Sequence, residues 1–230
     1  MSDEDSVIRQ IAECHERRTL ALTQTLRVIA ELKNTVFFQH VCSMAIPMLY
    51  AEWEGFIKEV LQLYLEYLQK RAIPQKDIRS EILAYAWSGS FRKLSSELTL
   101  SKKVELIKRF LDSLDKGLNF EKKELEIETK SNLRFKVLED IAENLCLDIS
   151  TIKEHEKKLD ALVNRRNNIA HGGREQKISE EYIEENKSLI ELIMDALESV
   201  LLDAIKSKKY LINSIDGVLL TDKHETGLTQ

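Results

Sequence analysis

Apolar residues recur at helical spacing along most of the chain. In the first pattern, from Ser6 to about Lys33, they fall three or four positions apart, and Ser6 is expected to cap the start of the helix. A longer pattern runs from about Val36 to Arg71 and is interrupted only by Pro47, which we expect to kink this helix or to mark its true first turn. The wide apolar face of this second helix predicts that other helices, or a second copy of the chain, bury it.

The middle of the chain predicts shorter elements. Helices are expected around residues 80–87, 101–113 and 133–144, with loops near Ser88-Gly89 and over residues 115–119. Residues 125–129 alternate between apolar and polar side chains, which leaves a short strand and an extended loop as alternatives.

Two more helices are predicted in the last third of the chain. One runs from Ser150 or Thr151 to about Ala170 and stops at Gly172-Gly173, because glycine can adopt the left-handed conformation that ends helices. The other spans about 179–209, with Ser179 as its cap. Since no internal repeat or long linker is present, we predict a single helical domain over residues 1–210 and a peripheral tail over 211–230.

Composition agrees with an all-α fold. The 230 residues include only 7 Gly and 2 Pro, too few turn residues for a β-sandwich or barrel. The longest uncharged run, residues 34–51, contains several polar side chains and a proline, so we expect no transmembrane segment. The acidic start of the sequence lacks the features of a secretory signal, and we therefore expect a cytoplasmic protein.

Charge and cysteine content exclude further classes. With 34 basic and 39 acidic residues the net charge is -5, so any contact with nucleic acid must be local; the best basic stretch is 151–174. Cys14, Cys42 and Cys146 are far apart, which predicts buried thiols rather than disulfides or a zinc site. No metal-ligand spacing and no glycine-rich phosphate loop is present, so we expect neither a metal nor a cofactor.

The residues with the clearest chemical potential lie at the end of the helix predicted before Gly172. A helical wheel places Arg166 in the middle of the apolar stripe formed by Leu159, Leu162 and Val163. An arginine there cannot lose its proton and must be compensated by a carboxylate, an anion or a wet cleft between subunits. His171 follows five residues later. Taken alone, such an arginine is more often a structural ion-pair partner, and such a histidine more often a helix cap, than a catalytic group.

Three segments resemble one family. The segment 166–171 resembles the R-x4-H signature of the HEPN superfamily, with a polar Asn167 after the arginine and Gly172 after the histidine. The segments 49–56 and 132–136 are similar to motifs of its small stand-alone prokaryotic branch, the RiboL-PSP-HEPN and MAE-like proteins. The order of elements fits over roughly residues 35–210.

The resemblance implies an antiparallel HEPN-like helical bundle with additional short helices, and a metal-independent endoribonuclease whose composite site forms in a homodimer. Catalysis would fall to Arg166, His171 and Asn167, with Arg165 as an auxiliary phosphate contact. Many such proteins act in toxin or antiviral-defence systems, which implies RNA as the substrate and an antitoxin or another defence-system protein as a partner. The alternative is a non-catalytic dimerisation module that binds RNA, nucleotide or protein.

Two residues of the second predicted helix are left with open roles. Glu54 falls between Leu61 and Leu65 on the wheel and is expected to be partly buried. It either orients Arg166 or His171, or pairs with another basic residue inside the bundle. Trp53 is expected to be a core residue rather than a platform for stacking bases.

Overall fold

A computed structural model describes residues 2–95, 99–129, 132–173 and 177–213. Within these residues the regular structure is helical, with two isolated β-bridges and no strand. The prediction of an all-α fold is thus confirmed. The α-helices are α1 (Asp3–Leu32), α2 (Phe38–Lys70), α3 (Ser80–Ala86), α4 (Ser88–Ser95), α5 (Leu100–Leu111), α6 (Lys122–Leu125), α7 (Phe135–Asn144), α8 (Glu156–Ala170) and α9 (Glu180–Lys206).

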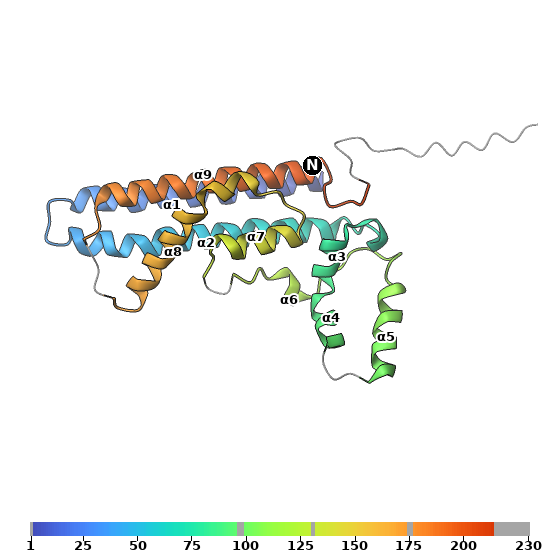
Figure 1. Ribbon diagram of the computed structural model, residues 1–230. Coiled ribbons are helices and arrows are strands. Elements are labelled where there is room, and N and C mark those ends of the chain that lie inside the picture. The colour runs from blue at the N-terminus through green and yellow to red at the C-terminus, as the bar shows by residue number, and fades with distance from the viewer. Residues whose placement is uncertain (1, 96–98, 130–131, 174–176, 214–230) are drawn as a thin grey trace, which may run out of the picture.

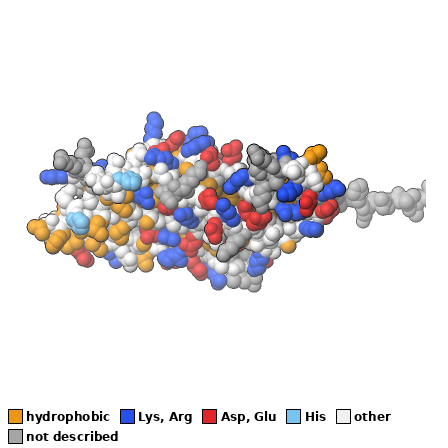
Figure 2. Space-filling view, turned by 90° about the horizontal axis from the view of Figure 1, so that it is seen from below, with side chains coloured by type: hydrophobic (Ala, Val, Ile, Leu, Met, Phe, Trp, Pro, Cys, Tyr) orange, Lys and Arg blue, Asp and Glu red, His pale blue; other side chains and the backbone are white. Residues whose placement is uncertain are grey.

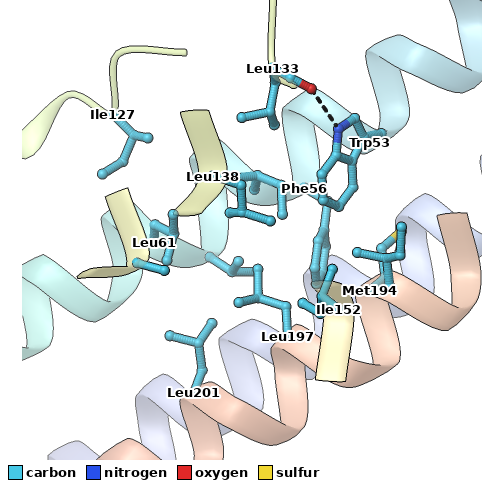
Figure 3. Packing of buried hydrophobic residues seen from close by; sticks show 14 of the residues in the cluster. Trp53, Phe56, Leu61, Ile127, Leu133, Leu138, Ile152, Met194, Leu197 and Leu201 are labelled. Carbon is cyan, nitrogen blue, oxygen red and sulfur yellow. Dashed lines mark hydrogen bonds between the residues drawn. The ribbon is translucent and has the colours of Figure 1, made fainter. Parts of the chain in front are cut away.

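Three long helices form the body of the molecule. Helices α1, α2 and α9 lie side by side, and α8 crosses α2 obliquely (Figure 1). The core between them is closely packed: Trp53, Phe56 and Leu61 of α2 meet apolar side chains of α7 and α9 (Figure 3). Because Trp53 is fully buried, it is a core residue, as predicted.

The first helix begins earlier than its apolar pattern indicates. Ser2, and not Ser6, is the N-cap: its hydroxyl accepts from the Asp5 backbone N–H at 3.0 Å, while the Asp5 carboxylate accepts from the Ser2 N–H. Acidic residues in the first turn also favour this start, since they face the positive end of the helix dipole. The expected cap at Ser6 was therefore wrong by about one turn.

Helices α3 to α5 show a second correction. The predicted loop at Ser88-Gly89 is in fact the start of α4. Gly89 is not needed for a turn. Its lack of a side chain allows Glu124 to approach the backbone of α4, because a Cβ there would lie 2.6 Å from Oε1 of Glu124. Helix α4 is held by aromatic contacts, with Phe91 stacked on Trp87 and packed against Phe110 of α5.

The remaining boundaries agree with the predictions in part. The short helix α6 covers the first of residues 125–129, and no strand forms there. Residues 150–155 form a 3-10 helix that precedes α8, where one continuous helix was expected. Helix α2 is continuous through Pro47, so this proline does not mark a first turn. Ser179 caps α9 as predicted, accepting from the Tyr182 N–H at 3.1 Å.

The end of the described chain is attached to the bundle. The Ile212 N–H donates to the Asp77 carbonyl at 3.0 Å, and Leu211 forms a β-bridge with Ile78. The rest of the predicted tail, residues 214–230, lies outside the described residues. Where the chain is described, no helix has the length and apolarity needed to cross a bilayer.

Candidate active site

Helix α8 carries the candidate residues on its last turns. Its first turns are anchored by the buried side chains of Leu159, Leu162 and Val163, whereas Ile169 is half-buried and Ala170 exposed. The apolar stripe of α8 is therefore buried at the start of the helix and becomes exposed toward its C-terminus. Arg166, in the middle of that stripe, is half-buried as a result and not enclosed.

The end of α8 places His171 at the surface. His171 is the C-cap residue and is exposed, and its backbone N–H donates to the Asn167 carbonyl at 3.0 Å. Gly172 follows with a φ of 70°, and the Gly173 N–H returns to the Asn168 carbonyl at 2.9 Å. The predicted helix stop at this glycine pair is confirmed. Within the described part of the chain, the His171 imidazole forms no hydrogen bond or ion pair.

Arg166 is compensated by an aromatic ring. Its guanidinium carbon lies 4.6 Å from the centre of the Tyr50 ring on α2, and its Nη1 donates to Oδ1 of Asn167 at 2.9 Å. No carboxylate of the described residues forms an ion pair with it. The face of the Tyr50 ring carries negative charge density that attracts a cation. Because no carboxylate of the described residues pairs with the guanidinium, its N–H groups suit an anionic ligand.

Asn167 ties this arginine to the segment before α7. Its Nδ2 donates to Oδ1 of Asn132 at 3.2 Å. The next residue, Leu133, is fixed to α2 at both backbone groups: its N–H donates to the Tyr50 hydroxyl at 2.7 Å, and its carbonyl accepts from Nε1 of Trp53 at 3.4 Å (Figure 3). Two segments far apart in sequence thus position Arg166 and Asn167 together.

Arg134 holds the same segment against α8 one turn earlier. It donates to Oδ1 of Asn164 at 2.5 Å and lies 3.7 Å from Oδ2 of Asp160. The other Asp160 oxygen accepts from the Phe135 N–H at 3.2 Å, at the start of α7. These bonds fix the orientation of α8 and, with it, the direction in which Arg166 points.

Glu54 lies in the layer behind Tyr50. It accepts a hydrogen bond from the Thr129 hydroxyl and forms an ion pair of 2.9 Å with Lys58, one turn further along α2. Burial alone would raise the pKa of Glu54, but these bonds, together with one from the Tyr50 hydroxyl, hold it below its usual value. No contact of Glu54 with Arg166 or His171 is present among the described residues. The geometry places it as a support for Tyr50.

Arg165 contacts a different helix from Arg166. Its guanidinium carbon lies 4.6 Å from the centre of the Tyr182 ring on α9. Arg165 and Arg166 are thus each stacked on a tyrosine, from α9 and α2 respectively. The two positive charges at the end of α8 are therefore directed to rings on different helices.

The family model described as RiboL-PSP-HEPN matches residues 17–203 of the chain. The chain belongs to this HEPN family. No curated protein and no solved structure matches the chain significantly. HEPN proteins are generally associated with RNase activity, so the family places the chain among proteins with an RNA-related function.

The HEPN match covers all the residues that meet around Arg166. The sequence motifs at 49–56 and 132–136 contain Tyr50, Asn132 and Arg134. The resemblance in these motifs nevertheless predicted no role for the three side chains. The signal that could have found Tyr50 is its position one turn before Glu54, on the same face of α2. The contact between Asn132 and Asn167 has no local signal, because it joins residues 35 positions apart.

The donor groups at this candidate site suit phosphate more than a cation. Among the described residues no three His, Cys, Asp or Glu side chains are grouped so that they could hold a metal ion. Arg166 provides a permanent positive charge with a planar arrangement of donors, and His171 provides an exposed imidazole at the same helix end. Such groups can neutralise a phosphate and transfer protons to or from its oxygens.

Proposed function

We propose that the chain is a metal-independent endoribonuclease whose composite site forms between two copies. The observation that carries the proposal is the position of Arg166. Its charge is held against the ring of Tyr50 by neutral partners, on the part of α8 that leaves the core. The exposed His171 follows one and a half turns later on the same helix end.

The reaction that fits these groups is internal transfer at phosphorus. A base removes the proton of the ribose 2′-OH, and this oxygen attacks the adjacent phosphorus. The bond from phosphorus to the 5′-oxygen breaks, an acid protonates that oxygen, and the products are a 2′,3′-cyclic phosphate and a 5′-hydroxyl. Arg166 would stabilise the charge that builds up on the phosphoryl oxygens. Asn167 would position Arg166 or contact the substrate, and Arg165 would bind a neighbouring phosphate.

Two proton transfers explain why a second copy is needed. One chain brings a single histidine to the end of α8, whereas cleavage needs both a base and an acid. A twofold axis beside α8 would supply a second His171 from the partner. The composite site would then contain two histidines and two arginines.

An apolar surface at the same end of the molecule as the site supports pairing with a second copy. A groove of about 410 Å³ between α1 and α2 is lined by Val28, Met44 and Met48, and the two methionines are 52% and 50% exposed. The loop before α2 adds Val36 and Phe37, both exposed. Figure 2, which views the molecule from the side of α8, shows hydrophobic side chains gathered at this end. Surfaces of this kind on a folded domain mark interfaces.

The biological role proposed here is that of a toxin or an antiviral-defence effector. The support for it is the family and the chemistry of the site, since a nuclease directed at RNA harms its own cell unless a partner protein restrains it. A cytoplasmic location belongs to the same proposal, because RNA is found there.

The decisive assay is incubation of RNA with excess EDTA. The wild type is compared with Arg166→Ala, His171→Ala and, as a matched control on the outer face of the same helix, Lys157→Ala. We expect fragments ending in 2′,3′-cyclic phosphate from the wild type and the control, and a rate at least about 100-fold lower from the other two. Equal cleavage by all four proteins, or none by the wild type on several RNAs, would contradict the proposal. Circular dichroism must show that each variant is folded.

The dimer is tested separately. Met44→Glu and Met48→Glu introduce charges into the groove between α1 and α2 without touching Arg166 or His171. We expect monomers in analytical ultracentrifugation and loss of RNA cleavage, with unchanged circular dichroism. If the wild type is itself a monomer at concentrations at which it cleaves RNA, the composite site is wrong.

One observation favours the alternative of a non-catalytic module. Arg166 and Asn167 already satisfy part of their bonding with Tyr50 and Asn132, as structural residues do. In that case the wild type would bind RNA, a nucleotide or a protein and leave RNA intact. Arg166→Ala would then lower the free energy of unfolding, and His171→Ala would change neither stability nor RNA integrity.

A further inference from the structure

Helix α5 presents an apolar face that nothing in the described chain covers. No residue of α5 is buried, and four apolar residues along one side are exposed by 42% or more: Leu100, Val104, Ile107 and Leu111. In Figure 1, α4 and α5 stand away from the bundle, at the opposite end from the tip of α8. This surface is therefore separate from the candidate active site.

The other side of α5 is fixed to α4. Phe110 packs against Trp87 with ring centres 5.1 Å apart, and Arg109 lies over the same indole at 5.3 Å. Arg109 also donates to the Ser90 hydroxyl at 2.8 Å. These contacts hold α5 on the side of Arg109 and Phe110. They therefore determine that the side with the four apolar residues faces solvent.

The spacing of the exposed residues is that of a helix-pairing seam. Leu100, Val104, Ile107 and Leu111 are separated by four, three and four positions, which matches the d, a, d and a positions of a heptad. The seam extends over 11 steps of about 1.5 Å, roughly 16 Å or three helical turns. A face of this width seats one partner helix.

Charges beside the seam select the partner. Lys103 occupies the g position and Lys108 the e position, one on each side of the apolar residues. Among the described residues, neither lysine forms an ion pair. If two copies of α5 paired in parallel, Lys103 would face Lys108 of the other copy; if they paired antiparallel, each lysine would face its own counterpart. Both arrangements bring like charges together, which disfavours a second copy as the occupant.

We propose that α5 binds an acidic amphipathic helix of a partner protein, with apolar residues along one face and Asp or Glu at the flanking positions. Its apolar residues would cover the seam, and its carboxylates would pair with Lys103 and Lys108. This surface fits a partner protein better than an anionic membrane, because the narrow 4-3-4 pattern matches one helix and Glu105 lies on the polar face. The inference does not depend on RNA cleavage.

The test uses two synthetic helices of four heptads with identical apolar a and d positions. One carries Glu at every e and g position and the other carries Lys. Binding of each labelled peptide to the full chain is followed by fluorescence anisotropy. We expect the Glu peptide to bind at least about tenfold more tightly than the Lys peptide, and to weaken severalfold between 50 and 500 mM NaCl.

Three variants sharpen the test. The double variant Lys103→Glu, Lys108→Glu should reverse the preference and favour the Lys peptide. Ile107→Ser should weaken both complexes by about tenfold. Lys102→Glu is the matched control, because it makes the same charge change at an exposed residue of α5 outside the seam, and it should preserve the preference. These residues are exposed or at the helix surface, and circular dichroism checks that the fold is retained.

The proposal is overturned if both peptides bind equally, if neither binds, or if Ile107→Ser has no effect. Vesicles with 30% phosphatidylglycerol provide the comparison with a membrane. Binding to these vesicles that depends on Ile107, with no preference between the peptides, would assign the surface to lipid instead. Since no arm of the experiment measures RNA cleavage, its failure leaves the nuclease proposal untouched, and the reverse also holds.

Discussion

The Arg166 guanidinium carbon lies 4.6 Å from the centre of the Tyr50 ring, and the hydroxyl of the same tyrosine accepts the backbone N–H of Leu133 at 2.7 Å. One side chain of α2 therefore positions a charge on α8 and the segment that leads into α7. Burial raises the pKa of Tyr50, so its hydroxyl stays protonated and can donate while it accepts.

Substitutions at Tyr50 should separate these two functions. Tyr50→Phe keeps the ring but leaves the Leu133 N–H unpaired, so we expect a loss of about 1–2 kcal/mol in the free energy of unfolding with little change in RNA cleavage. Tyr50→Leu also removes the ring, and we expect cleavage to fall by about tenfold or more. Urea denaturation and the RNA assay measure the two effects. Equal cleavage by both variants would mean that stacking does not position Arg166.

The bond between Asn132 and Asn167 should be visible as an energetic coupling. Asn132→Ala, Asn167→Ala and the double variant form a double-mutant cycle in urea denaturation. We expect a coupling of about 0.5–1 kcal/mol, because a neutral hydrogen bond contributes about this much. The same cycle between Asn132→Ala and Lys157→Ala is the control and should be additive. A coupling near zero in the first cycle would show that the two amides do not support each other.

The glycine after His171 should be sensitive to its backbone conformation alone. Gly172 has a φ of 70°, and a Cβ built there meets no atom within 4 Å. Gly172→Ala is therefore expected to cost about 1–2 kcal/mol from left-handed strain without any clash, and Gly172→Asn less. We expect the order of RNA cleavage to follow the order of stability, since the glycine sets where His171 sits. Full activity of a destabilised Gly172→Ala would contradict this link.

The pH dependence of stability should contain a contribution from Glu54. Its pKa is lower in the folded chain than the usual value of 4.5, so its contacts with Thr129 and Lys58 contribute stability above about pH 4.5. This stability is lost as the pH falls through the lower, folded pKa. We expect Glu54→Gln to be less stable than the wild type at pH 7, and the difference to shrink below pH 4.5. Glu66→Gln, an exposed residue of α2, is the control; a difference that persists at low pH would remove the carboxylate as its cause.

The sequence pattern predicted the elements that depend on local chemistry. The stop at Gly172, the cap at Ser179 and the long apolar face of α2 follow from backbone preference and periodicity, and the structure contains all three. The expected burial of the thiols is met by Cys14 and Cys42, whereas Cys146 is only half-buried.

Contacts between distant segments account for what the pattern missed. Ser88-Gly89 has the composition of a turn, but the packing of Phe91 on Trp87 continues the chain as α4. In the same way, the wheel identified Arg166 as a charge in an apolar stripe, while its partner Tyr50 lies 116 positions earlier and is set only by the crossing of α2 and α8. Local rules therefore located the unusual arginine but not its surroundings.

Helix α2 carries Met48 and Tyr50 two positions apart, the first in the groove shared with α1 and the second beneath Arg166. The groove proposed to pair two copies and the ring that positions Arg166 therefore belong to one helix. A substitution that tilts α2 to improve the packing at Met48 would also move the Tyr50 ring away from Arg166. Substitutions on these two sides of the helix are therefore expected to occur together during evolution. If the groove pairs two copies as proposed, a substitution that alters pairing at Met48 should also require a compensating change near Tyr50.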